Sequence, residues 1–162
     1  MKEVAILLLV ALMLNGCNSS TATVQTAAGG IWQAQMLGGN GPASGFSFIS
    51  QFTVNGDGSL SISSFQFLTS NSAQCFPVTG GTETGSMILT ENTTNFTVTG
   101  TFKFTVQSGG NTLTLNGTVT GTENGLNGTT LSGGSITGTW TLTGGAGCSV
   151  TTGNTSFTMT QS

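Results

Sequence analysis

The fold is decided by residues 96–107, which read Phe96-Thr97-Val98-Thr99-Gly100-Thr101-Phe102-Lys103-Phe104-Thr105-Val106-Gln107. Apolar side chains or glycine alternate with Thr, Lys and Gln along the whole stretch. Because successive side chains of a β-strand point to opposite faces, a period of two buries one face and leaves the other wet. The stretch therefore predicts a long antiparallel strand with one face in a core.

The same period of two recurs along the chain, most clearly at residues 46–54, 113–119 and 136–142. Clusters rich in Gly and Asn separate the runs, as turn residues do between the strands of hairpins. In the third run the phase switches between Ile62 and Phe65, which predicts a β-bulge near Ser63. In all we predict eight strands, at residues 30–37, 44–55, 59–69, 82–90, 95–107, 111–122, 131–143 and 153–160.

Long strands joined by tight hairpins favour a closed sheet, because closure removes the free edges and covers the apolar face. We therefore predict an all-β, eight-stranded antiparallel up-and-down barrel. A β-sandwich and, less favoured, a β-solenoid stay open as alternatives. Gly100, Gly117 and Gly138 fall within the inward rows, where they allow sharp coiling or leave space in the lumen. The side chains expected to line the lumen are Trp32, Phe46, Phe48, Phe52, Phe96, Phe102, Phe104 and Trp140.

The first predicted strand opens with Gly30-Ile31-Trp32, which resembles the Gly-x-Trp signature of the calycins, the lipocalin and avidin-like barrels. The resemblance implies a calycin-like barrel in which the Trp closes one end. It also implies that a small ligand could be held in the lumen.

The N-terminal end has the pattern of an export signal. Met1-Lys2-Glu3 precede an apolar run at residues 4–14, which is too short to span a bilayer as a mature helix. The run ends in Leu14-Asn15-Gly16-Cys17, which resembles the bacterial lipobox. The resemblance implies cleavage before Cys17 and attachment of lipid to that cysteine. The rest of the chain is similar to Gly/Thr-rich lipoproteins of bacterial genomes.

The predicted organisation has three parts. Residues 1–16 are the signal peptide, residues 17–29 a lipidated flexible tether of small polar residues, and residues 30–162 a single β domain. Asn18 follows the lipidated cysteine, whereas an Asp there is the usual inner-membrane retention signal of the lipoproteins it resembles. We therefore expect a cell-envelope protein held by its lipid, at the outer membrane.

The composition excludes several classes of function. The chain has no His or Tyr and only two Lys plus Arg residues, so it cannot neutralise nucleic-acid phosphates. General bases and activated nucleophiles are also missing, which argues against an enzyme. Zinc and copper lack their usual ligands, and we interpret Asp57, Glu91 and Glu123 as solvated turn carboxylates instead of a calcium site. We predict no metal and no cofactor.

Cys75 and Cys148 are predicted to form a disulfide, because the domain is exported and Cys17 is taken by lipid. In a meander the connections alternate between the two ends of the barrel. The third-to-fourth and seventh-to-eighth connections, which carry these cysteines, therefore emerge at the same end, opposite the acidic turns.

Two functions remain. The first is a non-catalytic structural or surface-interaction lipoprotein with a packed core, for which no protein partner can be named. The second is a lipocalin-like module that binds a small apolar ligand in a Phe-lined lumen. A cavity of a few hundred Å³ would favour the second, because that is the size small ligands require.

Overall fold

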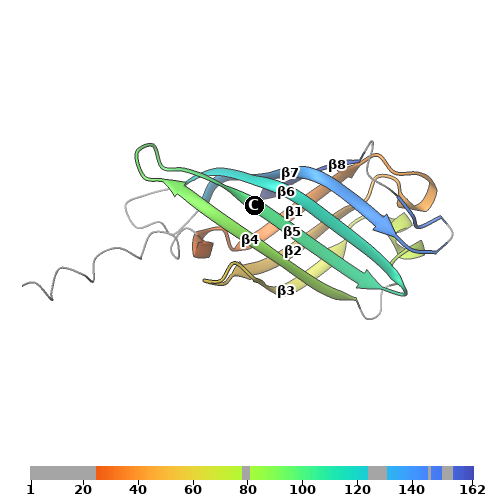
Figure 1. The fold of residues 1–162 in the computed structure, drawn as a ribbon. Coiled ribbons are helices and arrows are strands. Elements are labelled where there is room, and N and C mark those ends of the chain that lie inside the picture. The colour runs from red at the N-terminus through yellow and green to blue at the C-terminus, as the bar shows by residue number, and fades with distance from the viewer. Residues whose placement is uncertain (1–24, 78–80, 124–130, 146, 151–154) are drawn as a thin grey trace, which may run out of the picture.

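The computed structural model describes residues 25–77, 81–123, 131–145, 147–150 and 155–162, and it confirms the all-β barrel (Figure 1). All eight strands belong to one antiparallel sheet, so neither the sandwich nor the solenoid is formed. Two short 3-10 helices lie in the connections, η1 (Gly41–Ala43) and η2 (Ser70–Gln74). The strands are β1 (Gly30–Leu37), β2 (Ser47–Val54), β3 (Leu60–Phe67), β4 (Thr82–Asn92), β5 (Thr97–Ser108), β6 (Asn111–Glu123), β7 (Leu131–Thr143) and β8 (Ser156–Gln161).

The strand order is β3-β2-β1-β8-β7-β6-β5-β4, so the first and last strands pair and the sheet ends at β3 and β4. These two edge strands meet at one end only. Ser59 and Ser86 form an isolated antiparallel bridge, and the Met87 N–H donates to the Gly58 carbonyl at 2.7 Å. Among the described residues the ladder does not continue beyond this point, so β3 and β4 separate toward the end of β3 and the start of β4.

The predicted bulge in β3 is confirmed. Gln51 pairs with Ser64 and Phe52 with Ile62, which leaves Ser63 as the extra residue. The Ser63 hydroxyl donates to the Gln51 carbonyl at 3.1 Å. The switch of phase along β3 thus keeps its apolar side chains on the inner face.

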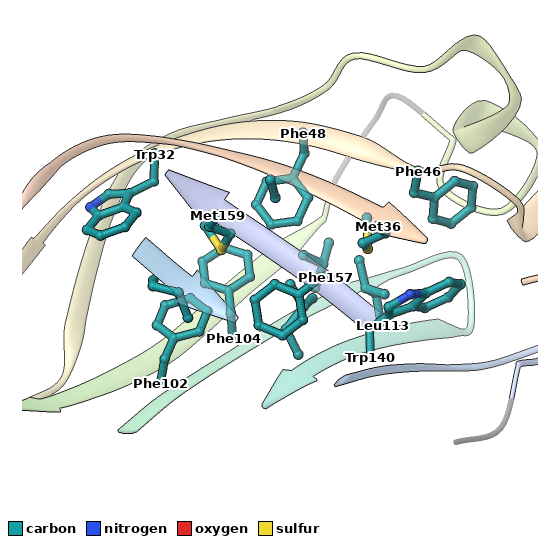
Figure 2. Close-up of a cluster of buried hydrophobic side chains, with 14 of the residues drawn as sticks. Trp32, Met36, Phe46, Phe48, Phe102, Phe104, Leu113, Trp140, Phe157 and Met159 are labelled. Carbon is teal, nitrogen blue, oxygen red and sulfur yellow. The ribbon is translucent and has the colours of Figure 1, made fainter. Parts of the chain in front are cut away.

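The lumen is filled by side chains and is not an open cavity (Figure 2). The rings pack closely, for example Phe48 on Phe104 with centroids 5.6 Å apart and Phe102 on Phe104 at 6.0 Å. Seven of the eight side chains predicted to line the lumen are buried here, at 3% exposure or less. They are Trp32, Phe46, Phe48, Phe52, Phe102, Phe104 and Trp140.

Phe96 is the exception, and its prediction was wrong. Its side chain is 50% exposed and its φ of 55° is left-handed. Because β5 begins at Thr97, Phe96 belongs to the turn after β4, where a residue with positive φ completes the hairpin. The alternation of residue types continues one position beyond the strand itself.

Two glycines lie between two aromatic residues across the sheet. Phe102 pairs with Gly117, Gly117 with Gly138, and Gly138 with Phe157, on β5, β6, β7 and β8 in turn. A Cβ on Gly117 would lie 2.8 Å from the Phe157 Cζ. The space that Gly117 leaves is therefore occupied by the Phe157 ring, whose centroid lies 6.4 Å from that of Phe102, whereas a Cβ on Gly138 would meet the backbone of Asn116 and Gly117.

The end of the predicted tether is packed, contrary to expectation. Gln25, Ala27 and Ala28 are buried, and the Trp32 indole N–H donates to the Ala28 carbonyl at 3.0 Å. The structured part therefore includes residues 25–29, because Trp32 needs both an apolar cover and a hydrogen-bond acceptor at this end of the barrel. The predicted signal peptide, Cys17 and the rest of the predicted tether lie outside the described residues. Within the part of the chain that is described, no helix is long and apolar enough to cross a membrane.

Candidate functional site

A cleft of about 440 Å³ lies where β3 and β4 separate. The end of β3, the segment around η2, the start of β4 and the end of β5 surround it. It opens through the side of the barrel and is bounded by the edge strands, whereas the sequence predicted a ligand space in the lumen. None of the eight predicted lumen residues lines it.

One wall of the cleft is aromatic and is formed by Phe65, Phe67 and Phe76. Phe65 meets Phe67 edge to face with centroids 4.9 Å apart, and Phe67 stacks on Phe76 at 5.0 Å. Phe65 and Phe67 are only partly buried, in contrast to the lumen rings, because no strand covers this part of β3. The wall offers apolar surface at the edge of a packed core.

The other wall is polar and comes from β4 and β5. Glu83 pairs with Val106, whose buried side chain marks the inner face, and Glu83 is itself half-buried on that face. Its Oε1 lies 2.9 Å from where a Cβ on Gly81 would be, so the absence of a side chain at Gly81 makes room for the carboxylate. The same Cβ position is 3.9 Å from the Ser108 Cβ, which places Ser108 close by.

The polar groups of this wall lack partners within the described part of the chain. Ser108 is 8% exposed, and its hydroxyl makes no hydrogen bond with any described residue. Lys103 is the one cationic side chain in the described ranges, and it is exposed on the opposite, outer face of β5. A buried hydroxyl and a half-buried carboxylate therefore face the cleft without a donor from any residue that the structure describes.

The disulfide holds the η2 side of the cleft in place. Cys75 and Cys148 are bonded with their Cα atoms 5.5 Å apart, as predicted. The Asn111 side-chain amide reinforces the bridge by donating to the Cys75 carbonyl at 2.6 Å and accepting from the Gly145 N–H at 3.1 Å. Because Phe76 follows Cys75 directly, these bonds position the aromatic wall.

The carboxylates of Asp57, Glu91 and Glu123, at the other end of the barrel, do not form one cluster of three. Asp57 accepts hydrogen bonds from the Ser59 hydroxyl at 2.7 Å and the Ser59 N–H at 2.9 Å, which lower its pKa. Glu123 forms a side-chain hydrogen bond with Glu91, and this bond, with burial and the nearby negative charge, raises the pKa of Glu123. Within the described ranges, no three groups of metal-binding type come together.

The raised pKa of Glu123 gives a testable pH dependence. The folded state holds this proton more tightly than the unfolded state, so stability falls as pH rises from the ordinary carboxyl pKa through the raised one. We expect Glu123→Gln to raise the Tm by about 1–2 °C at pH 7.5 and to leave it unchanged at pH 3.5. Thermal melts at both pH values measure this. Asp57→Asn should instead lower the Tm at pH 7.5. The lowered pKa of Asp57 means that its ionised form is stabilised in the folded state, and this stabilisation is present above the ordinary carboxyl pKa.

The cysteine pair was thus predictable from the sequence, whereas the cleft and its polar residues were not. Glu83 and Glu91 lie near opposite ends of β4 and therefore form no carboxylate pair. No family model, no curated protein and no solved structure matches this chain.

Proposed function

We propose that the protein is a non-catalytic, lipid-anchored binding module of the cell envelope, which holds a small apolar ligand in the cleft between β3 and β4. The observation that carries this proposal is the aromatic cleft of about 440 Å³. Pockets of this size suit small molecules, which bind chiefly through apolar and aromatic contacts. The ligand is placed at the side of the barrel because packed rings fill the lumen.

The chemistry of the cleft supports binding instead of catalysis. An activated serine needs a base within hydrogen-bond reach, and the Ser108 hydroxyl has no such bond to any described residue. Glu83 is the one ionisable side chain that lines the cleft. A single carboxylate and a hydroxyl without a base supply recognition, not a general acid–base pair.

A pair of tryptophan substitutions tests the binding site. Ala73 lines the cleft and is exposed, so Ala73→Trp should fill the opening without disturbing the core. Gln74 is exposed next to it but does not line the cleft, so Gln74→Trp is the matched control. With the neutral dye N-phenyl-1-naphthylamine, we expect wild type and Gln74→Trp to give the same fluorescence titration. Ala73→Trp should weaken binding at least tenfold.

Equal binding by both variants, or no binding by the wild type, would refute the cleft as a ligand site. The second outcome would favour the other candidate, a structural or surface-interaction lipoprotein. The observation that favours this second candidate is the filled lumen, in which the largest side chains are fully buried.

The lipid anchor has its own test. Cys17→Ser should prevent lipid attachment, so that the protein moves from the detergent phase to the aqueous phase on Triton X-114 partitioning. Metabolic labelling with a palmitate analogue should be lost at the same time. A variant that still partitions into detergent and still carries label would contradict the lipobox assignment.

A further inference from the structure

We infer that the ligand of the cleft carries a cationic amine on its apolar body, and that Glu83 and Ser108 recognise the amine. This inference rests on the proposed function and adds the chemical class of the ligand. It follows from three observations at one place in the fold: a carboxylate and a buried hydroxyl to which no described residue offers a cation or a hydrogen bond, and an aromatic wall in the same cleft.

Glu83 occupies a position where the fold would take an apolar side chain. It lies on the inward row of β4, which continues through Gly85 to the buried Met87 and Leu89. Withdrawing a carboxylate from water is costly unless a positive charge or hydrogen-bond donors compensate it. Glu83 is half-buried, and since Lys103 lies on the other face of the sheet, no described side chain offers it a positive charge.

Ser108 supplies the second polar contact. Buried hydroxyls almost always have a hydrogen-bond partner, and no described residue supplies one to Ser108. Its Cβ and the Glu83 Oε1 both lie within 4 Å of the empty Cβ position at Gly81, at 3.9 and 2.9 Å. One ammonium group has several N–H donors, so it can donate hydrogen bonds to the Glu83 carboxylate and to the Ser108 hydroxyl oxygen at the same time.

The opposite wall is aromatic, and two of its rings, Phe65 and Phe67, are only partly buried. The same rings provide the apolar surface for a hydrocarbon body. An anionic amphiphile such as a fatty acid would instead place its carboxylate near Glu83, in a chain with a net charge of −3.

Three probes with the same hydrocarbon chain separate the charge from the apolar contribution. Octylamine, 1-octanol and octanoate are titrated against the full-length protein at pH 7.5, where the amine is protonated, with displacement of N-phenyl-1-naphthylamine as the readout. We expect octylamine to bind about tenfold more tightly than octanol, and octanoate to bind most weakly. Salt should weaken the binding of octylamine and leave that of octanol unchanged.

Glu83→Gln should remove the preference for the amine and keep the affinity for octanol, and Ser108→Ala should reduce the affinity for octylamine a few-fold. Glu91→Gln, at the far end of the same strand, is the matched control and should change neither affinity. If octanol and octylamine bind equally to the wild type, the inference about the amine is wrong while the cleft remains a ligand site. If none of the three probes displaces the dye, and the dye itself fails to bind, the proposed function fails.

Discussion

Replacing Cys75 and Cys148 with alanine is expected to lower the free energy of unfolding by about 4 kcal/mol. The bridge joins residues 73 positions apart, and closing so long a loop removes much of the conformational entropy of the unfolded chain. Both cysteines are also buried in the core cluster. Urea unfolding of the double variant, followed by tryptophan fluorescence, measures the loss.

Two controls separate the covalent bond from the change of side chains. Wild-type protein treated with dithiothreitol should lose a similar amount of stability. In a Cys17→Ser background, the denatured and unreduced chain should contain no titratable thiol. Two free thiols in that assay, or equal stability of the bridged and alanine proteins, would contradict the disulfide.

Gly117→Ala is expected to destabilise the fold by about 3 kcal/mol, although glycine is normally the poorer residue in a strand. The added Cβ would lie 2.7 Å from the Thr137 carbonyl oxygen and 2.8 Å from the Phe157 Cζ. The Thr137 carbonyl oxygen belongs to the backbone, so it cannot move without disturbing the β6–β7 ladder. Gly56→Ala is the matched control, because nothing lies within 4 Å of its Cβ position.

A double-mutant cycle tests the cause. Phe157→Leu replaces the ring that meets Gly117 with a shorter aliphatic side chain. The double variant Gly117→Ala/Phe157→Leu should therefore lose less stability than the sum of the single variants, by about 1 kcal/mol. Simple additivity would show that the ring does not cause the clash. The result would then point to the Thr137 carbonyl and the Ile136 Cγ2, which lies 3.1 Å from the same Cβ position.

The periodicity of residue types was sufficient to predict the strands, because a half-buried strand records its two environments in alternate residues. It also located the bulge at Ser63, since the apolar phase must switch where a residue is inserted. Phe96 was misplaced because the alternation of residue types carries on through the turn, while only backbone hydrogen bonds define where β5 begins.

The cleft could not be predicted in the same way. Phe65 and Phe67 continue the apolar pattern of a core strand, and the pattern is the same whether or not a neighbouring strand covers it. Whether β3 pairs with β4 along its whole length depends on the path of the chain between them, which includes η2 and the bridge to Cys148. The roles of Glu83 and Ser108 follow from that gap and carry no signal in the sequence alone.

The position of the gap also suggests a different route for the chain. Because β1 pairs with β8, the Gln161 side-chain amide reaches the Gly29 carbonyl at 2.8 Å, and the two terminal strands lie side by side. A circular permutant that joined the present ends and began at β4 would finish with β3. Its strands would then follow the sheet from one edge to the other in chain order, from β4 through β8 and β1 to β3. The natural chain starts in the middle of its sheet, and its closing β1–β8 pair is the contact most distant in sequence. The permutant would turn that pair into a local hairpin and should fold faster.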